Sequence, residues 1–295
     1  MSVHSRRHFL KTGLAATTLA ASPLVAAPTR RSATDLVELG NSGVKVTRLA
    51  FGTGTFSGRV QRELGQDQFT RLVRHAYDRG VRFFETAESY SGMAEMLGIA
   101  LKGLPRESYQ LMTKYTFKGD EPSQVKIDRF RKQMNSEYFD VLLLHCVRQP
   151  TWSADLKKLQ DDFSEAKHKK VILSKGASVH GLPALRAFPG NRWLDIAMIR
   201  MNHMGSHMDT PETRDINMPG NVEEVVSHVK KVRGQGAGII SMKLVGEGSF
   251  TNADDRQAAL NFAFGVAGVH AVTIGYKNTA EIDGAIDRVN ASLNL

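Results

Sequence analysis

The sequence predicts an α/β fold, a (β/α)8 or TIM barrel. Eight short apolar segments alternate with longer segments whose apolar residues recur at helical spacing. Without a short N-terminal targeting segment the chain has roughly 270 residues, a length typical of one such barrel. No G-x-G-x-x-G motif follows a predicted strand and opens a helix, which counts against a nucleotide-binding open sheet.

The predicted strands are short apolar runs, and their number favours a closed sheet. They are residues 49–51, 81–84, 109–113, 141–144, 171–174, 196–201, 239–242 and 271–274. Eight parallel strands that are joined by crossover helices close into a barrel. A doubly wound open sheet is the alternative, but Gly52-Thr53-Gly54 matches its glycine-rich motif only in part.

The segments between the strands have the spacing of amphipathic helices. In the first, the apolar side chains lie at i, i+3, i+4, i+7 and i+8, and Asp-Arg-Gly at residues 78–80 ends the helix. These apolar residues are Phe69, Leu72, Val73, Ala76 and Tyr77. Further helices are predicted at residues 122–134, 153–166, 182–188 and 256–264, along the face Val222, Val225, Val226 and Val229, and along the face Ile282, Ala285, Ile286 and Val289. Residues 203–220 form a long irregular stretch, and no second domain or low-complexity linker is predicted.

The N-terminus has the pattern of a signal peptide. The segment Ser5-Arg6-Arg7-His8-Phe9-Leu10-Lys11 precedes an alanine-rich stretch, residues 12–27, that is too short to serve as a permanent membrane span. It resembles the twin-arginine consensus S-R-R-x-F-L-K. The resemblance implies a signal over residues 1–27, cleavage near Ala26 or Ala27, the twin-arginine (Tat) export machinery as partner, and a periplasmic or otherwise exported barrel over residues 28–295. A chance basic amphipathic start is the alternative.

Charge and cysteine content exclude several classes of protein. The net charge is +9. Arg6, Arg7 and Lys11 lie in the leader, where no acid offsets them, so the mature chain carries about +6. No block of Lys and Arg follows, which favours a solvated basic surface over a nucleic-acid partner. The single cysteine, Cys146, cannot form an internal disulfide, and no Cys/His cluster has metal-ligand spacing.

Four polar residues follow or end consecutive predicted strands. They are Glu85, Tyr90, Lys114 and His145. In such a barrel the chemistry gathers at the carboxyl ends of the strands. Taken singly, each has a structural explanation: a packing aromatic, a strand-capping histidine or a Lys–Glu ion pair. Together they predict a proton donor, because a nearby ammonium lowers the pKa of a phenol, a carboxylate positions the ammonium, and an imidazole orients the substrate oxygen.

Motifs around these residues resemble the aldo-keto reductase family. Residues 84–90, Phe-Glu-Thr-Ala-Glu-Ser-Tyr, resemble F-D-T-A-x-x-Y, and residues 95–98 resemble the E-x-x-[IL]-G that follows it. Thr113-Lys114 and Leu143-Leu144-His145 match the strand ends with the family's lysine and histidine. The likeness runs from about residue 36 to 295. It implies hydride transfer between NADP(H), or NAD(H), and a carbonyl or alcohol substrate such as an aldehyde, ketone or sugar, with Tyr90 as general acid or base.

The same resemblance implies a set of cofactor-binding residues. The segment Lys175-Gly176-Ala177-Ser178 matches G-[IV]-S, whose serine contacts the nicotinamide, and Met242-Lys243-Leu244 resembles M-K-P-L. The predicted cofactor-binding residues are Gly52, Thr53, Ser178, Asn202, Lys243 and Lys277. No metal site is predicted. The loops at residues 147–152, 203–220 and 246–252 are expected to determine substrate specificity.

Three positions depart from the family pattern. Glu85 replaces an aspartate and is one methylene longer, so its contact with Lys114 must be rebuilt. Met198 replaces the amide that binds the nicotinamide carboxamide, and residues 274–278 resemble only loosely the segment that binds the 2′-phosphate. Two alternatives therefore stay open: a barrel of the same ancestry that binds cofactor or ligand without efficient turnover, and an unrelated barrel hydrolase.

Overall fold

The structure is a computed structural model that describes residues 30–211 and 219–295. The predicted leader lies outside the described residues, as does part of the stretch 203–220. Among the residues that are described, no helix is both long and apolar enough to cross a membrane.

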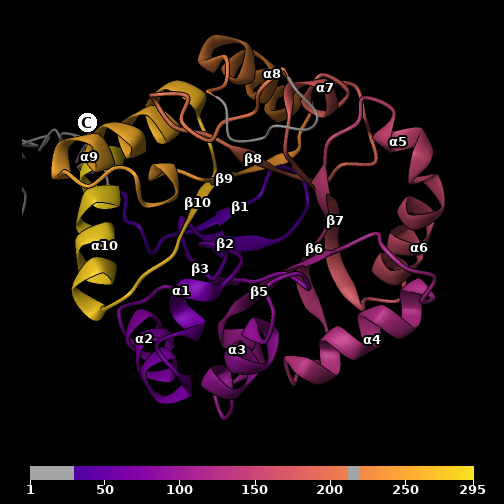
Figure 1. The fold of residues 1–295 in the computed structure, drawn as a ribbon, viewed down its shortest axis with the longest axis horizontal. Helices are drawn as coiled ribbons and strands as arrows, with labels where there is room; N and C mark the ends of the chain where they lie inside the picture. Colours follow the sequence, from indigo (N-terminus) through magenta and orange to yellow (C-terminus); the bar gives the residue numbers. More distant parts are fainter. Residues whose placement is uncertain (1–29, 212–218) are drawn as a thin grey trace, which may run out of the picture. The chain divides into compact units, whose positions relative to one another are not determined.

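Eight parallel strands form a closed barrel, which confirms the predicted fold class. They are β3 (Leu49–Gly52), β4 (Phe83–Glu85), β5 (Gln110–Tyr115), β6 (Phe139–Val147), β7 (Ile172–Val179), β8 (Ile196–Arg200), β9 (Gly238–Met242) and β10 (Ala271–Ile274). The barrel closes where β10 pairs with β3. Helices surround the strands in Figure 1. The open-sheet alternative is therefore wrong.

The helices follow the predicted alternation with different bounds. They are α1 (Arg59–Arg62), α2 (Gln66–Asp78), α3 (Met93–Leu101), α4 (Ser123–Gln133), α5 (Trp152–Asp155), α6 (Lys157–His168), α7 (Leu182–Leu185), α8 (Val222–Gly234), α9 (Ala253–Asn261) and α10 (Thr279–Leu293). The helix predicted at 153–166 is divided into α5 and α6 at Leu156, whose φ of −105° and ψ of 22° depart from the α-helical values. The helix predicted at 256–264 changes after Asn261 into a π-helical segment, η3 (Phe262–Ala267).

Strand β7 is longer than predicted, and it contains a glycine that packs closely against the neighbouring strand. The prediction ended the strand at Ser174, whereas the strand continues to Val179. A Cβ at Gly176 would lie 1.9 Å from the carbonyl oxygen of Ile196 on β8. Glycine at this position therefore allows close strand packing and does not end the strand.

An N-terminal hairpin, which the sequence analysis did not predict, closes one end of the barrel. Strands β1 (Leu36–Glu38) and β2 (Lys45–Thr47) pair antiparallel. Leu39, Val44 and Val46 belong to the same buried apolar cluster as the side chains inside the barrel. A Cβ at Gly238, the first residue of β9, would lie 2.7 Å from Cβ of Leu39. The hairpin thus covers the amino ends of the strands and leaves the carboxyl ends for a site.

Inside the barrel the inward-facing side chains change from apolar to polar along the strands. The apolar cluster includes Phe83 of β4 and Met112 of β5. Two residues further along each strand, on the same face, lie Glu85 and Lys114, both buried. The period of two therefore brings the carboxylate and the ammonium together just below the carboxyl rim.

Candidate active site

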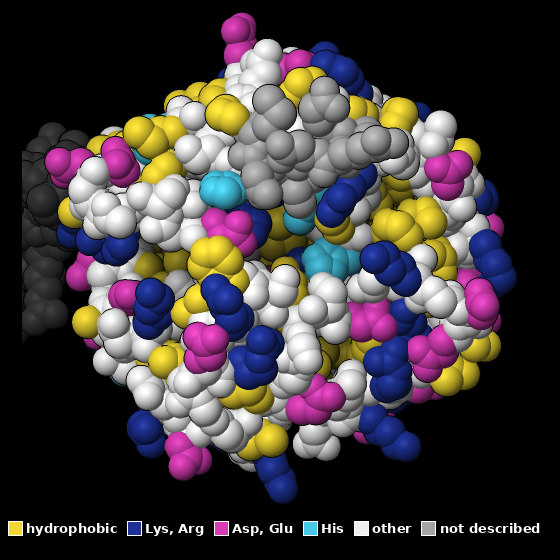
Figure 2. Space-filling model, in the orientation of Figure 1, with side chains coloured by type: hydrophobic (Ala, Val, Ile, Leu, Met, Phe, Trp, Pro, Cys, Tyr) yellow, Lys and Arg dark blue, Asp and Glu magenta, His cyan; other side chains and the backbone are white. Residues whose placement is uncertain are grey.

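Three cavities lie at the carboxyl ends of the strands, and two of them meet at Tyr90. The main cavity, of about 740 Å³, is lined from seven of the eight strands or the loops after them, among others by Tyr90, His145, His180 and Lys243. The inner cavity, of about 70 Å³, is lined by Gly52, Glu85, Tyr90, Met198 and Lys243, among others. The outer cavity, of about 160 Å³, lies beside α9 and α10. Figure 2 shows a hollow near the centre of this face, with histidine side chains at its edge.

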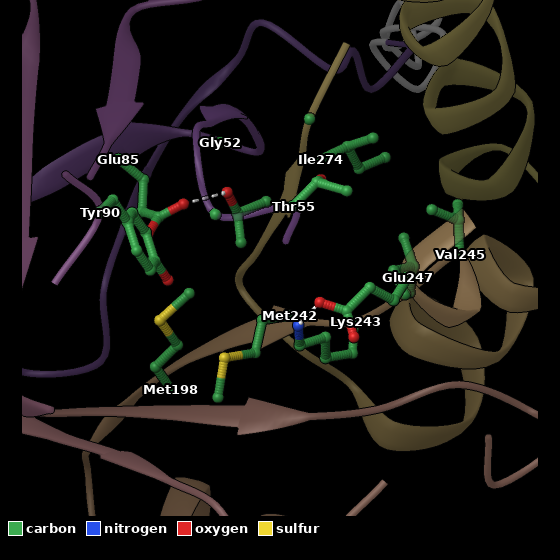
Figure 3. Close-up of a pocket in the computed structure, with 14 residues that line it drawn as sticks. Gly52, Thr55, Glu85, Tyr90, Met198, Met242, Lys243, Val245, Glu247 and Ile274 are labelled. Carbon is green, nitrogen blue, oxygen red and sulfur yellow. Dashed lines mark hydrogen bonds and ion pairs between the residues drawn. The ribbon is translucent and has the colours of Figure 1, made fainter. Parts of the chain in front are cut away.

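Glu85, Lys114 and Tyr90 form a connected chain of polar groups. The buried Lys114 ammonium donates to Oε1 of Glu85, to the Thr86 carbonyl oxygen at 3.0 Å and to Tyr90 Oη at 3.2 Å. These bonds use all three ammonium protons. Oε2 of Glu85 accepts from Thr273 Oγ1 at 3.2 Å. The longer side chain of Glu85 therefore reaches Lys114, and Figure 3 shows Glu85 and Tyr90 beside the inner cavity.

The pKa of Tyr90 shifts in the opposite direction from the one predicted. Burial, and then the negative charge of Glu85, raise the pKa of Tyr90 well above its ordinary value. The sequence-based expectation of a lowered pKa is therefore wrong, because burial outweighs the effect of the nearby Lys114 ammonium. Burial also lowers the pKa of Lys114, which Glu85 partly opposes. The phenol consequently stays protonated at neutral pH and can act as an acid.

His145 faces the main cavity as a neutral imidazole. Burial, followed by the positive charges of Lys114, Lys243 and Arg148, lowers its pKa to about 3. Its Nδ1 lies 3.2 Å from Ser89 Oγ, and its ring meets the Tyr90 ring edge-on with centroids 5.7 Å apart. Nε2 has no hydrogen-bond partner among the described residues, so it can contact a ligand oxygen.

Glycines make room for the phenol and for the rim of the inner cavity. A Cβ at Gly54 would lie 2.7 Å from Tyr90 Oη, and a Cβ at Gly52 would lie 2.5 Å from Thr273 Oγ1. Side chains at either position would displace the polar groups that surround Glu85. Gly52 and Lys243, both predicted to bind the cofactor, do line the inner cavity.

Three other predicted cofactor residues have their polar groups engaged within the protein. Thr53 Oγ1 donates to the Glu85 carbonyl oxygen at 3.0 Å, and Ser178 Oγ accepts from the Cys146 amide at 3.0 Å. Asn202 donates to the carbonyl oxygens of Ser206 and Lys243 and accepts from the amides of Met204 and Ser206. None of the three lines the cavities described above. Asn202 therefore organises the loop after β8 with both of its donor protons.

Lys277 lies at the outer cavity, together with two arginines that the sequence analysis missed. Arg256 and Arg288 line this cavity from α9 and α10, and no carboxylate lies within ion-pair distance of either among the described residues. The buried hydroxyl of Tyr276 has no partner there. Because the arginines come from different helices, no motif in the sequence brings them together.

The main cavity also has lining residues that were not singled out. Phe56, Phe117, Arg148, Trp152 and His180 belong to it. Two of them, Arg148 and Trp152, come from the loop at residues 147–152, which was expected to determine specificity. Phe56 and Phe117 follow β3 and β5, where the sequence analysis predicted no specificity loop.

Comparison with known proteins identifies the family. The family model of the aldo/keto reductases matches residues 48–292, and the chain belongs to that family. The chain is 32% identical to L-galactose dehydrogenase of Arabidopsis thaliana over 124 residues, which are 38% of this chain and 38% of that protein. It is 32% identical to versiconal hemiacetal acetate reductase of Aspergillus parasiticus over 173 residues, 47% of this chain and 50% of that protein. The chain thus spans half or less of the length of these curated relatives.

Solved structures of the family share the fold. The holo form of an aldo-keto reductase from Bacillus halodurans has a TM-score of 0.68 at 16% identity and covers 88% of this chain and 95% of its own. An aldo-keto reductase from Klebsiella pneumoniae in complex with NADPH has a TM-score of 0.62 at 15% identity, with 87% and 88% covered. At these identities the likeness shows the barrel alone.

Proposed function

We propose that the protein is an oxidoreductase that transfers a hydride between NADP(H) and a carbonyl or alcohol substrate, with Tyr90 as general acid or base. One observation carries the proposal: Tyr90 Oη lies 3.2 Å from the Lys114 ammonium, beside His145, where the main and inner cavities meet. The contact between Lys114 and Glu85 argues against a barrel that has lost turnover through its longer carboxylate.

The residues present fit a nicotinamide dinucleotide. Among the described residues, the two arginines of the outer cavity have no carboxylate partner and the Tyr276 hydroxyl has no hydrogen-bond partner, a set that suits a phosphate. Gly275 and Thr55 line both the outer and the inner cavity, and a Cβ at Gly275 would lie 2.7 Å from Thr55 Oγ1, so glycine fits where the two cavities adjoin. Lys277, Arg256 and Arg288 would bind the phosphate end, and Gly52 and Lys243 would border the nicotinamide end. When bound, the dinucleotide supplies or accepts the hydride.

The residues of the chain supply the proton and orient the substrate. In reduction, Tyr90 donates its hydroxyl proton to the carbonyl oxygen, and the Lys114 ammonium stabilises the phenolate that forms. Glu85 and the Thr86 carbonyl keep the ammonium in place. Neutral His145 donates from Nε2 to the same oxygen when Nδ1 accepts from Ser89. In oxidation, the phenolate takes the proton from the alcohol.

Cofactor oxidation by the purified mature protein tests this function. The protein is incubated with NADPH or NADH and a panel of aldehydes, ketones and sugars, and absorbance of the reduced cofactor is followed. Loss of absorbance that depends on both substrate and protein supports the proposal. Tight cofactor binding without oxidation of any substrate would favour the impaired barrel, and no binding of either cofactor would favour an unrelated activity.

Arg288→Gln tests the preference for NADP over NAD. The variant is expected to weaken NADPH binding by about tenfold, since one charge-assisted hydrogen bond to a phosphate is lost, and to leave NADH binding nearly unchanged. Fluorescence titration of both cofactors measures this. Arg71→Gln, an exposed position on α2, is the control for charge. Equal losses of affinity for NADPH and NADH would mean that the outer cavity does not bind the 2′-phosphate.

We also propose that residues 1–27 direct export as a twin-arginine signal. Arg6→Lys with Arg7→Lys is expected to retain the protein in the cytoplasm, because lysine lacks the planar guanidinium that the exporter recognises. Cell fractionation and immunoblotting measure the distribution. The chain offers a matched control, because Arg30 and Arg31 form a second arginine pair beyond the expected cleavage site. Export of the Arg6/Arg7 variant at the level of the Arg30→Lys, Arg31→Lys control would contradict the proposal.

A further inference from the structure

The main cavity contains cations that differ in whether the protein neutralises them. Lys243 pairs with Glu247, and Arg200 pairs with Asp209 with Nε and Oδ1 3.0 Å apart. Arg148 and Lys118 also line the cavity, and no carboxylate lies within ion-pair distance of either among the described residues. Lys118 is exposed, whereas Arg148 is partly buried. Among the described residues that line the cavity, Arg148 is therefore a partly buried cation without a carboxylate counter-ion.

A bulge in β6 brings Arg148 into the cavity beside the proposed catalytic residues. The pairing of β6 with β7 shifts between Leu144 and Val147, and Cys146 has a φ of 60°, in the left-handed region. Such a bulge re-aims the side chains that follow it, and residues 145–149 all line the cavity. The guanidinium is steadied by Nε, which donates to Cys146 Sγ at 3.3 Å.

The positive charge of Arg148 affects the two histidines that line the cavity. It is one of the causes that lower the pKa of His145 and of His180, after burial and other positive charges. Asp155 is the nearest candidate in sequence for a counter-ion, but it is exposed and accepts a hydrogen bond from Thr151 Oγ1 at 2.6 Å. The guanidinium is thus available to an anion that lies close to His145.

Apolar side chains line the rest of the cavity mouth. Phe56 and Phe117 line it while 52% and 38% exposed, and the largely buried Trp152 lines it as well. Phe56 has a φ of 48°, an uncommon backbone state for a residue with a side chain, and such strain clusters at ligand sites. These walls suit a ligand with an apolar or aromatic body.

We propose that the substrate of this cavity is a carbonyl compound with an oxyanion, such as a carboxylate, on an apolar body, and that the Arg148 guanidinium binds the oxyanion. The proposal rests on the reductase function proposed above. Arg148 acts in binding, because its planar fork matches the two oxygens of a carboxylate, and the proton transfer stays with Tyr90.

A pair of aldehydes that differ only in charge tests the proposal by kinetics. The parent protein is expected to prefer 4-carboxybenzaldehyde to its methyl ester by at least about tenfold in kcat/KM. In Arg148→Gln the carboxylate substrate is expected to lose about 10- to 100-fold, through KM and not kcat, whereas the neutral ester loses far less. Arg148→Glu should reverse the preference. Arg192→Gln, an exposed position near the amino ends of the strands, removes the same charge and should keep the parent preference.

Binding of inert ligands separates this proposal from the function on which it rests. Calorimetry with 4-methylbenzoate and 4-methylbenzamide needs no turnover, and the parent should bind the anion at least about tenfold more tightly, a difference that Arg148→Gln abolishes. Tighter binding of phenyl phosphate would assign the oxyanion as a phosphate. Equal binding of 4-methylbenzoate and 4-methylbenzamide would overturn the proposal even if carbonyls are reduced. An Arg148→Gln variant that still binds the anion more tightly than the amide would do the same. Anion binding at Arg148 without reduction of any carbonyl would support the anion site and contradict the reductase function.

Discussion

Tyr90→Phe is expected to lose about 10²- to 10⁴-fold in kcat for carbonyl reduction, the range that general acid catalysis typically supplies. The substitution removes only the hydroxyl, so the edge-on contact of the ring with His145 remains. Lys114 keeps its bonds to Glu85 and to the Thr86 carbonyl, so the buried ammonium stays paired. NADPH affinity and the melting temperature should therefore change little, and steady-state kinetics with cofactor titration measure the difference.

A second tyrosine provides the control for removing a phenolic hydroxyl. Tyr77 lies on α2, and its hydroxyl donates to Ser108 Oγ at 2.8 Å, a contact outside the three cavities. Tyr77→Phe should retain kcat within about twofold of the parent, in keeping with the small effects of peripheral substitutions. If Tyr90→Phe also stayed within threefold of the parent rate, another group would have to be the acid.

The barrel could be predicted from the sequence because its signals are periodic. Eight apolar runs, separated by segments with helical spacing, predict the class of fold. A residue that ends a predicted strand can also be assigned to the carboxyl-end face of the barrel. The hairpin of β1 and β2 was missed because each strand has three residues, too few for a period to emerge. The strand at 171–174 was ended too early because Gly176 indicates a break unless the approach of β8 is known.

The site could be predicted only in part, because the role of a side chain depends on the groups with which it forms hydrogen bonds. The positions of Glu85 and Lys114 at the ends of consecutive strands were enough to predict that the two residues lie together. It could not reveal that Ser178 accepts from the Cys146 amide or that Asn202 organises a loop, since those contacts depend on backbone conformation after the strands. The pKa of Tyr90 was misjudged for a related reason: the sequence shows the nearby charge of Lys114 but not the burial that outweighs it.

Glu85→Asp is expected to reduce kcat by roughly 100-fold, because the longer carboxylate is part of an adapted contact. Oε1 accepts from Lys114, and Oε2 accepts from Thr273. Removing one methylene withdraws the carboxylate by about 1.5 Å, and misplacements of about 1 Å in a catalytic arrangement can cost this much. Steady-state kinetics measure the loss. A parent protein that is nearly inactive, together with a Glu85→Asp variant that gains carbonyl reduction, would instead show that Glu85 marks decay of the site.

Glu85→Gln completes the test, because it removes the charge and keeps the length. Both partners of the ion pair are buried, so the uncompensated Lys114 should lower the free energy of unfolding by about 3–5 kcal/mol, measured by denaturant titration. The charge of Glu85 also raises the pKa of Tyr90, so the variant's Tyr90 pKa should fall. Reduction needs the protonated phenol and is lost as pH rises through that pKa, so the alkaline limb of the profile of kcat against pH should move to lower pH. Parent, Asp and Gln forms with the same rates and the same profiles would show that position 85 has no part in catalysis.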